Sequence, residues 1–145
     1  MLAAALCVHL AETIDGLTYT GSQNTGNVFF GNEPAAPNKA VTVFGRPGTP
    51  EQSFNLPAAD PHAQIIVRGE QYAHRAGWEL ALAIHGALDH LDGVVLAEGT
   101  PDEVYVVGCT AQQSAPIELG RDANARPRFS LNFALSVNQP TAHRP

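Results

Sequence analysis

Six histidines and two cysteines are the residues of this sequence best suited to bind a metal ion or to attack a substrate. His74 and His85 are eleven residues apart, which places them on one side of a predicted helix but about 16 Å apart along its axis. Two ligands of one zinc ion must each lie about 2 Å from it, so these histidines cannot share a metal within one chain. The sequence also has neither an HExxH nor a CxxC motif. We therefore predict no metal site.

The candidates for a catalytic nucleophile are equally weak. Cys109 lies among valines in a predicted strand, where a thiol is usually a small buried hydrophobic group with a raised pKa. Ser22 is not part of a GxSxG motif. Asp60 and His62 are close enough in sequence to contact each other, but nothing brings a nucleophile to them. We therefore predict no catalytic residue and no enzymatic activity.

Residues 21–26, GSQNTG, have the glycine spacing of a phosphate-binding loop. Such a loop needs Lys and then Ser or Thr after its second glycine, to contact the phosphates and magnesium, and Asn27 and Val28 stand there instead. The net charge of −6, from 8 Lys and Arg against 14 Asp and Glu, also repels polyanions. We predict no cofactor and no tight binding of DNA or RNA.

The length of 145 residues suits a single domain over residues 1–145. Cys7 and Cys109 are expected to be free thiols in a reducing compartment, because a chain of this size can bury a core without a disulfide. Residues 1–12 are apolar but have no Lys or Arg before the apolar run, so they predict a mature amphipathic helix and not a signal peptide. No apolar stretch approaches the roughly 20 residues that cross a bilayer, and we expect no membrane partner.

Two helices are predicted. The first has leucines or isoleucine at every fourth residue from Leu2 to Ile14 and ends near residues 15–16. The second spans about 71–91, and its core-facing stripe consists of Ala73, Gly77, Leu80, Ile84, Leu88 and Leu91. A glycine inside this stripe predicts that the helix approaches a sheet closely. Three residues lie off the stripe and need a second surface to cover them: Trp78, Leu82 and His85.

Strands are predicted at residues 28–31, 39–45, 63–69, 93–99, 102–117 and 128–137. The last one alternates strictly between apolar and polar residues and follows a turn at 122–125, which indicates a hairpin. The run at 102–117 is apolar on both faces and should be central in its sheet. Residues 46–62 contain four prolines and predict a long connection without regular structure. We predict an α+β two-layer sandwich, with a mainly antiparallel four- to five-stranded sheet and two helices packed on one face.

The strand and helix at 63–91, followed by LGRDANARPRFSLNFALSV at 119–137, resemble the small minor capsid and tail-completion proteins of bacteriophages, the tail terminators of long non-contractile tails. In that family a strand ending in an Arg- and Gly-containing turn leads into the long helix, and the last hairpin commonly reads Gly-Arg-Asp-x-Asn-Gly-Arg before an alternating strand ending in Asn-Phe. The residues that match are Gly120, Arg121, Asp122, Asn124, Arg126, Asn132 and Phe133. Ala125 replaces the turn glycine of the family, so we expect Asn124 to adopt the left-handed conformation or the loop to be looser.

The resemblance implies a non-enzymatic subunit that closes into a ring, usually a hexamer, on top of the tail tube. Such a ring stops tube polymerisation, contacts the neck or head–tail connector and lets DNA pass without binding it specifically. The protein would be assembled in the host cytoplasm and reside in the tail or neck of the virion. The candidate contacts with neighbouring subunits or the tube are Trp78, Leu82, His85, Arg121, Asp122, Asn124, Arg126 and Arg128. If the strand at 127–137 lies at a sheet edge, its unpaired backbone groups offer a further contact.

Two other functions remain as alternatives. One is a head-side connector or stopper protein of similar size. The other is a small-ligand-binding or hydrolytic α+β domain with its site under the 46–62 segment. For Trp78, both a place in an interface and packing within the chain remain open, because aromatic residues are enriched in cores and in interface centres alike.

Overall fold

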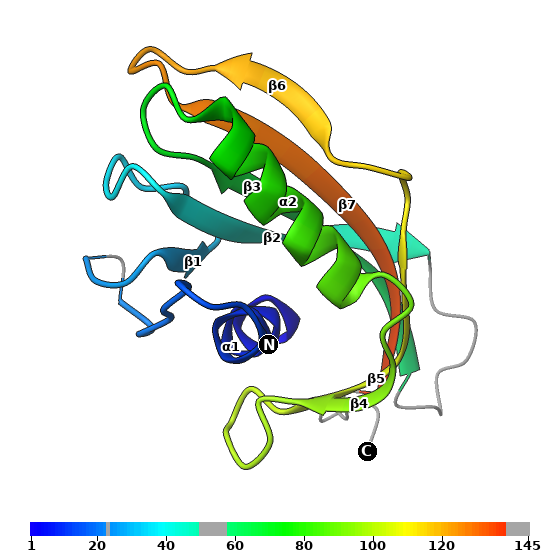
Figure 1. The fold of residues 1–145 in the computed structure, drawn as a ribbon. Helices are drawn as coiled ribbons and strands as arrows, with labels where there is room; N and C mark the ends of the chain where they lie inside the picture. The colour runs from blue at the N-terminus through cyan, green and yellow to red at the C-terminus, as the bar shows by residue number, and fades with distance from the viewer. Residues whose placement is uncertain (23, 50–57, 139–145) are drawn as a thin grey trace.

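The computed structural model describes residues 1–22, 24–49 and 58–138 (Figure 1). Within these ranges the elements are α1 (Leu2–Thr13), β1 (Val28–Phe30), β2 (Ala40–Thr49), β3 (Ala58–Arg68), α2 (His74–Leu88), β4 (Asp92–Leu96), β5 (Val104–Ala111), β6 (Ile117–Arg121) and β7 (Pro127–Asn138). In this part of the chain, neither helix is both long and apolar enough to span a bilayer.

The strands form one strongly curled sheet in the order β1-β2-β3-β7-β5-β4, with β6 paired to β7 beside this path (Figure 1). Both helices pack against the inner face of the curl and share one core with it. The α+β class is therefore confirmed, but the predicted simple sheet of four or five mainly antiparallel strands is wrong in its strand number and its simplicity. The sheet has seven strands and is mixed, because β1 pairs with β2 in parallel. A three-residue strand leaves too short a pattern to reveal its direction or partner.

The long strand β7 lies in the middle of the sheet. It pairs with β3 along its length, with β6 over its first half and with β5 over its second half. β7 is therefore not a sheet edge, and the further contact that depended on an edge position is not offered. Alternation reports which face of a strand is buried and not how many neighbours the strand has. Its apolar residues do face the core as predicted: Phe129, Leu131, Phe133, Leu135 and Val137.

The strand β5 lies between β7 and β4, so its predicted interior position is confirmed. Its second apolar face, however, is open: Tyr105 and Val107 are about 40% and 47% exposed on the outer face of the sheet. Apolar residues on both faces of β5 therefore do not mean that both faces are buried in the subunit.

The segment at 46–62 is more regular than predicted. β2 continues to Thr49 and β3 begins at Ala58, with Arg46 opposite His62 and an irregularity in the register between Arg46 and Thr49. Prolines are tolerated in strands at such irregularities, where a ladder hydrogen bond is already missing. The prediction of an irregular connection is thus wrong for 46–49 and 58–62, and its remainder, 50–57, lies outside the described residues.

The close approach of α2 to the sheet is confirmed at Gly77. A Cβ atom at this position would lie 2.9 Å from Cε2 of Phe129, and the Cα of Gly69 would be only 3.5 Å away. The helix is shorter than expected, because Ala73 is its N-cap and Asp89 already has an extended backbone. Ile84 and Leu88 of the predicted stripe are fully buried.

The two cysteines are free and buried, as expected. Burial raises the pKa of both thiols to about 12. Cys7 donates to the carbonyl of Phe29 over 3.4 Å, so it also helps to attach α1 to β1. Neither thiol has the exposed, electropositive environment of a reactive cysteine.

Candidate functional site

The turn between β6 and β7 is organised by the carboxylate of Asp122. Its Oδ1 atom accepts the backbone N–H groups of Asn124 at 2.9 Å and of Arg126 at 3.0 Å, and Oδ2 accepts Nε of Arg126 at 2.8 Å. Ala125 adopts the left-handed conformation with φ 58°, so the expectation that Asn124 would do so is wrong. The hydrogen bonds that Asp122 accepts fix Asn124 and Arg126, the residues on either side of Ala125. The chain therefore changes direction at Ala125.

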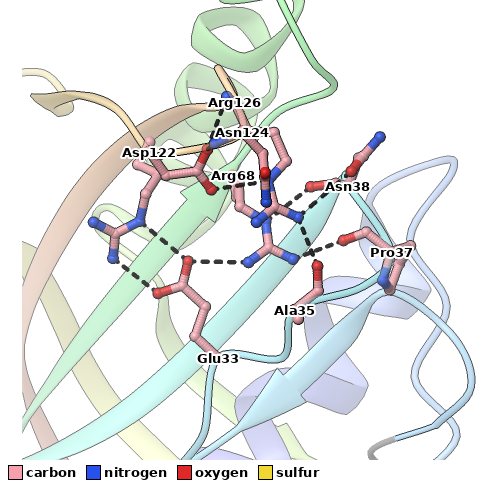
Figure 2. A network of polar contacts seen from close by, with 9 residues as sticks. Glu33, Ala35, Pro37, Asn38, Arg68, Asp122, Asn124 and Arg126 are labelled. Atoms are coloured by element: carbon pink, nitrogen blue, oxygen red, sulfur yellow. Dashed lines mark hydrogen bonds and ion pairs between the residues drawn. The ribbon is translucent and has the colours of Figure 1, made fainter.

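Arg126 extends this arrangement to the segment that connects β1 and β2. Its side chain is buried, and Nη1 donates to the carbonyl of Ala35 at 2.6 Å and to Oδ1 of Asn38 at 3.4 Å (Figure 2). The guanidinium therefore joins the β6–β7 turn to a segment almost ninety residues earlier in the chain. Arg126 serves the internal structure of the subunit and has little surface left for a partner.

Arg68, at the end of β3, holds the same segment from a second side. Its side chain is 4% exposed, Nε donates to the carbonyl of Asn38 at 3.0 Å and Nη2 to that of Pro37 at 2.7 Å (Figure 2). Nη1 lies 3.4 Å from the carboxylate of Glu33. Burial, followed by the nearby Arg126, lowers the pKa of Arg68, and Glu33 partly opposes that shift.

Arg128 completes the network, because its Nε and Nη2 atoms donate to the two oxygens of Glu33 at 3.1 and 2.8 Å. These hydrogen bonds raise the pKa of Arg128. We call Glu33, Arg68, Asp122, Arg126 and Arg128 the arginine clamp. Backbone carbonyls accept the guanidinium N–H groups that the two carboxylates do not bind, and the clamp ties the 31–39 segment to β3 and β7.

The helix residues proposed for an interface divide into two kinds. Trp78 is half-buried and contacts Phe129 edge-on at 5.8 Å between ring centroids. His85 is also half-buried, with Nε2 2.9 Å from the carbonyl oxygen of Gln113. Leu82, in contrast, is 41% exposed. Trp78 and His85 therefore pack mainly within the chain, and Leu82 is the exposed member of the three.

The hairpin residues divide in the same way. Arg121 is exposed, and its guanidinium lies over the ring of Tyr72 at 5.7 Å. Asn124 is exposed at the tip of the turn. Arg128 keeps a side-chain exposure of 31% in addition to its bonds in the clamp. The structure thus leaves Arg121 and Asn124, with part of Arg128, available at the surface.

Sequence reasoning missed most of the exposed apolar surface. Val95 of β4 stands opposite Tyr105 of β5, and both are about 40% exposed. Ile117 and Leu119 of β6 are 40% and 45% exposed. The sequence signal for the exposed residues of β5 was the apolar second face of 104–111, which we interpreted as evidence that both faces of this strand are buried. These residues form two separate exposed apolar sites, one on β4 and β5 and one on β6, and each is suited to protein contacts.

The Asp60 and His62 pair noted in the sequence lies in a shallow pocket of about 300 Å³ on the outer face of the sheet. Thr110 and Ser136 also line it, but among the described residues no hydrogen bond links Asp60 or His62 to either hydroxyl. The part of the chain that the structure describes likewise contains no group of three or more His, Cys, Asp or Glu side chains placed to hold a metal ion.

The clamp predicts a specific loss of stability in acid. Desolvation is the largest single influence and raises the pKa of Asp122, but the N–H groups of Arg126 and Asn124 and the Arg126 guanidinium together outweigh it and lower this pKa from its ordinary 3.8. Because this pKa is depressed in the folded state, ionised Asp122 stabilises the fold above about pH 4 and this contribution is lost as the pH falls through the folded pKa. Asp122→Asn should therefore unfold at a lower temperature than the native chain at pH 7, and the difference should shrink in acid.

Thermal unfolding followed by circular dichroism between pH 7 and pH 2.5 measures this effect. Asp15→Asn is the matched control, because Asp15 is an exposed carboxylate of a surface turn. A difference between Asp122→Asn and the native chain that stays constant over the whole pH range would contradict the assigned role of the carboxylate.

A family model described as "Bacteriophage tail terminator protein" matches residues 1–139. A comparison with curated proteins finds no match.

Proposed function

The chain belongs to the bacteriophage tail terminator protein family, and from this premise we propose that it closes into a ring of six subunits that caps the tail tube and joins it to the head–tail connector. Membership of the family makes it a structural protein of the phage tail. The match over residues 1–139 is the observation that carries the proposal, and it supports a single tail-terminator-like domain over residues 1–145.

The outward face of α2 supports assembly. Its first half exposes the ion pair of Arg75 and Glu79, but its second half exposes only Leu82, Ala83 and Gly86. A Cβ added to Gly86 would meet nothing within 4 Å, so this part of the helix is open to close approach by another protein. An exposed helix face without charge is unusual for a subunit that works alone.

The net charge of −6 fits a ring through which DNA passes. A channel that neutralised phosphates would release counterions and hold the DNA. In the proposed ring the subunits contact each other, the tube protein and the connector, and DNA slides through without a specific site.

Disruption of the gene in the phage that encodes the chain tests this function. Without a terminator the tube has no stop, so electron micrographs of lysates should show tails of uncontrolled length. Normal tails beside filled heads that leak DNA would instead assign the protein to the head side, as a connector or stopper. A gene copy supplied in trans should restore tails of uniform length.

The same complementation assay tests the apolar face of α2. Leu82→Glu should leave the melting temperature within a few degrees of the native value, because the side chain is already 41% exposed. It should fail to restore tail length, because a carboxylate buried in an interface without a partner is strongly unfavourable. Arg75→Glu, on the charged half of the same helix, is the control and should complement. Full complementation by Leu82→Glu would exclude this face from the interface.

A further inference from the structure

The charges of the chain are divided between two parts of the molecule. Residues 76–120 contain seven Asp and Glu residues and no Lys or Arg. Six of the eight Lys and Arg residues lie at the end of the molecule where α2 begins: Lys39, Arg68, Arg75, Arg121, Arg126 and Arg128. Two copies that each carry a net charge of −6 repel each other unless unlike surfaces meet. Such a chain favours contacts between its cationic end and its acidic part.

A corner at the cationic end presents an exposed aromatic ring. Tyr72 lies in the turn between β3 and α2 and is 69% exposed. Its φ of 61° is unfavourable for a bulky side chain, but its backbone N–H donates to the carbonyl of Ala125 at 3.0 Å and fixes it against the β6–β7 turn. The guanidinium of Arg121 lies over the ring at 5.7 Å. We call Tyr72 and Arg121 the cationic corner, and both are residue types that often dominate the binding energy of interfaces.

The guanidinium of Arg121 is free to bind a carboxylate. Within the part of the chain that the structure describes, its side chain forms no ion pair and donates no hydrogen bond. Two carboxylates of the same hairpin are engaged elsewhere. Glu118 lies 2.6 Å from Nε2 of His74. Asp122 accepts Nε of Arg126 at 2.8 Å. Because a guanidinium binds a carboxylate through two parallel hydrogen bonds, the corner suits an acidic side chain of a partner.

A hollow of about 250 Å³ lies beside Arg121. Pro127 and Phe129 form its apolar part, and His74 and Glu118 also line it. Sites that enclose a small molecule are usually larger, at about 300–1,000 Å³. The hollow therefore suits one or two side chains that project from another protein.

The connection between β4 and β5 is a projecting acidic loop, at the opposite end of the molecule from the β6–β7 turn (Figure 1). Its residues 97–103, AEGTPDE, include three carboxylates and an exposed proline, Pro101. The N–H of Gly99 donates to Oε1 of Glu103 at 2.9 Å, which helps to fix the loop. Glu98 is exposed, and its carboxylate has no hydrogen-bond or ion-pair partner among the described residues. The loop thus presents a free carboxylate beside an apolar side chain.

We infer that the cationic corner of one subunit binds the 97–103 loop of a second copy of this chain, with Glu98 against Arg121 and Pro101 toward the hollow. The inference rests on the proposed ring and names its subunit contact. The corner and the loop are different surfaces at opposite ends of the molecule, so the contact is head-to-tail and can repeat around a closed ring. A second copy is the occupant because this chain itself supplies, on a projecting loop, the free carboxylate that complements the free guanidinium.

Charge reversal tests the pairing of Arg121 with Glu98. Arg121→Glu or Glu98→Arg alone should weaken ring formation by the full chain about tenfold or more, because like charges then face each other. An equimolar mixture of the two variants should restore rings, since native and reversed pairs then alternate from one contact to the next. Native mass spectrometry over a range of protein concentrations measures the ring population.

Arg46→Glu is the matched control for Arg121→Glu. Arg46 is also an exposed arginine over an aromatic ring, that of Phe44 at 5.5 Å, but it lies on β2 outside the corner. This variant should assemble like the native chain. A mixture of Arg121→Glu and Glu98→Arg that stays as weakly assembled as either variant alone would overturn the proposed pairing.

Tyr72→Gly tests the aromatic half of the corner. Glycine adopts a φ near 60° without strain, so the melting temperature should stay within a few degrees of the native value. Ring formation should weaken about tenfold, because the side chain that supports Arg121 and contacts the loop is lost. Native-like assembly of this variant would exclude Tyr72 from the contact.

The unmodified chain separates this inference from the proposed function. Rings of the native chain that both charge reversals leave intact would overturn the corner–loop contact and keep the ring. Absence of rings of the native chain at every concentration, with or without assembled tail tubes, would overturn both.

Discussion

Replacing Arg68 with alanine is expected to lower the free energy of unfolding by about 3–5 kcal/mol, the range for breaking a buried charged network. The Arg68 side chain is 4% exposed and donates to two backbone carbonyls and to Glu33. Alanine removes the donor of these two carbonyls and leaves Glu33 with Arg128 as its remaining arginine partner. Loss of the long side chain also leaves a cavity at the end of β3.

Urea unfolding followed by tryptophan fluorescence and circular dichroism measures this loss. Arg75→Ala is the matched control. Arg75 is 92% exposed and pairs with Glu79 one turn along α2, so its removal should cost about 0.5 kcal/mol or less. Arg68→Lys keeps the charge but lacks the rigid planar guanidinium that binds three acceptors at once. Its loss of unfolding free energy should therefore lie between those of Arg68→Ala and Arg75→Ala. A loss below about 1 kcal/mol for Arg68→Ala would mean that the clamp contributes little to folding.

Phe129→Ala is expected to lower the free energy of unfolding by a similar amount, about 3–5 kcal/mol, because it leaves a cavity between α2 and the sheet. The ring is 1% exposed and lies under the point where Gly77 brings the helix closest. Trp78 and His74 both contact it edge-on, at 5.8 and 5.4 Å between centroids. The helix cannot collapse into the cavity easily, because its backbone already approaches Gly69 closely.

Phe44→Ala is the control for Phe129→Ala. Phe44 is half-exposed and carries the guanidinium of Arg46 over its ring at 5.5 Å, so it loses less buried surface on truncation. At roughly 2–4 °C per kcal/mol for a chain of this size, Phe129→Ala should melt about 10 °C lower than the native protein. Equal losses for the two variants would show that the α2–sheet contact is not the main support of the fold.

The two predictions concern opposite faces of β7. Phe129 anchors α2 on the inner face, and the arginine clamp holds the 31–39 segment and the β6–β7 turn in place. β6 is the arm of that hairpin that leads into the turn.

The sequence by itself was sufficient for features that depend on neighbouring residues. The period of four in residues 2–14 and the strict alternation of 129–137 predict α1 and β7 because both patterns are set by residues close in sequence. The predicted amphipathic character of α1 is wrong, because consecutive residues from Ala3 to Cys7 are buried. Gly77 inside a helical stripe predicted its close contact with the sheet, because a glycine there otherwise costs stability. The motif at 120–126 led to the family that the match over 1–139 confirms.

Only the tertiary structure decided which strands are neighbours and what the arginines do. The central place of β7 and its pairing with β6, β3 and β5 depend on segments that are distant in the sequence, which no local period records. The sequence suggested surface roles for Arg126 and Arg128 because their partners, Ala35, Asn38 and Glu33, come some ninety residues earlier. The physical reason is that burial and strand pairing depend on contacts that close long loops of the chain. Periodicity, in contrast, depends on residues within a few positions of each other.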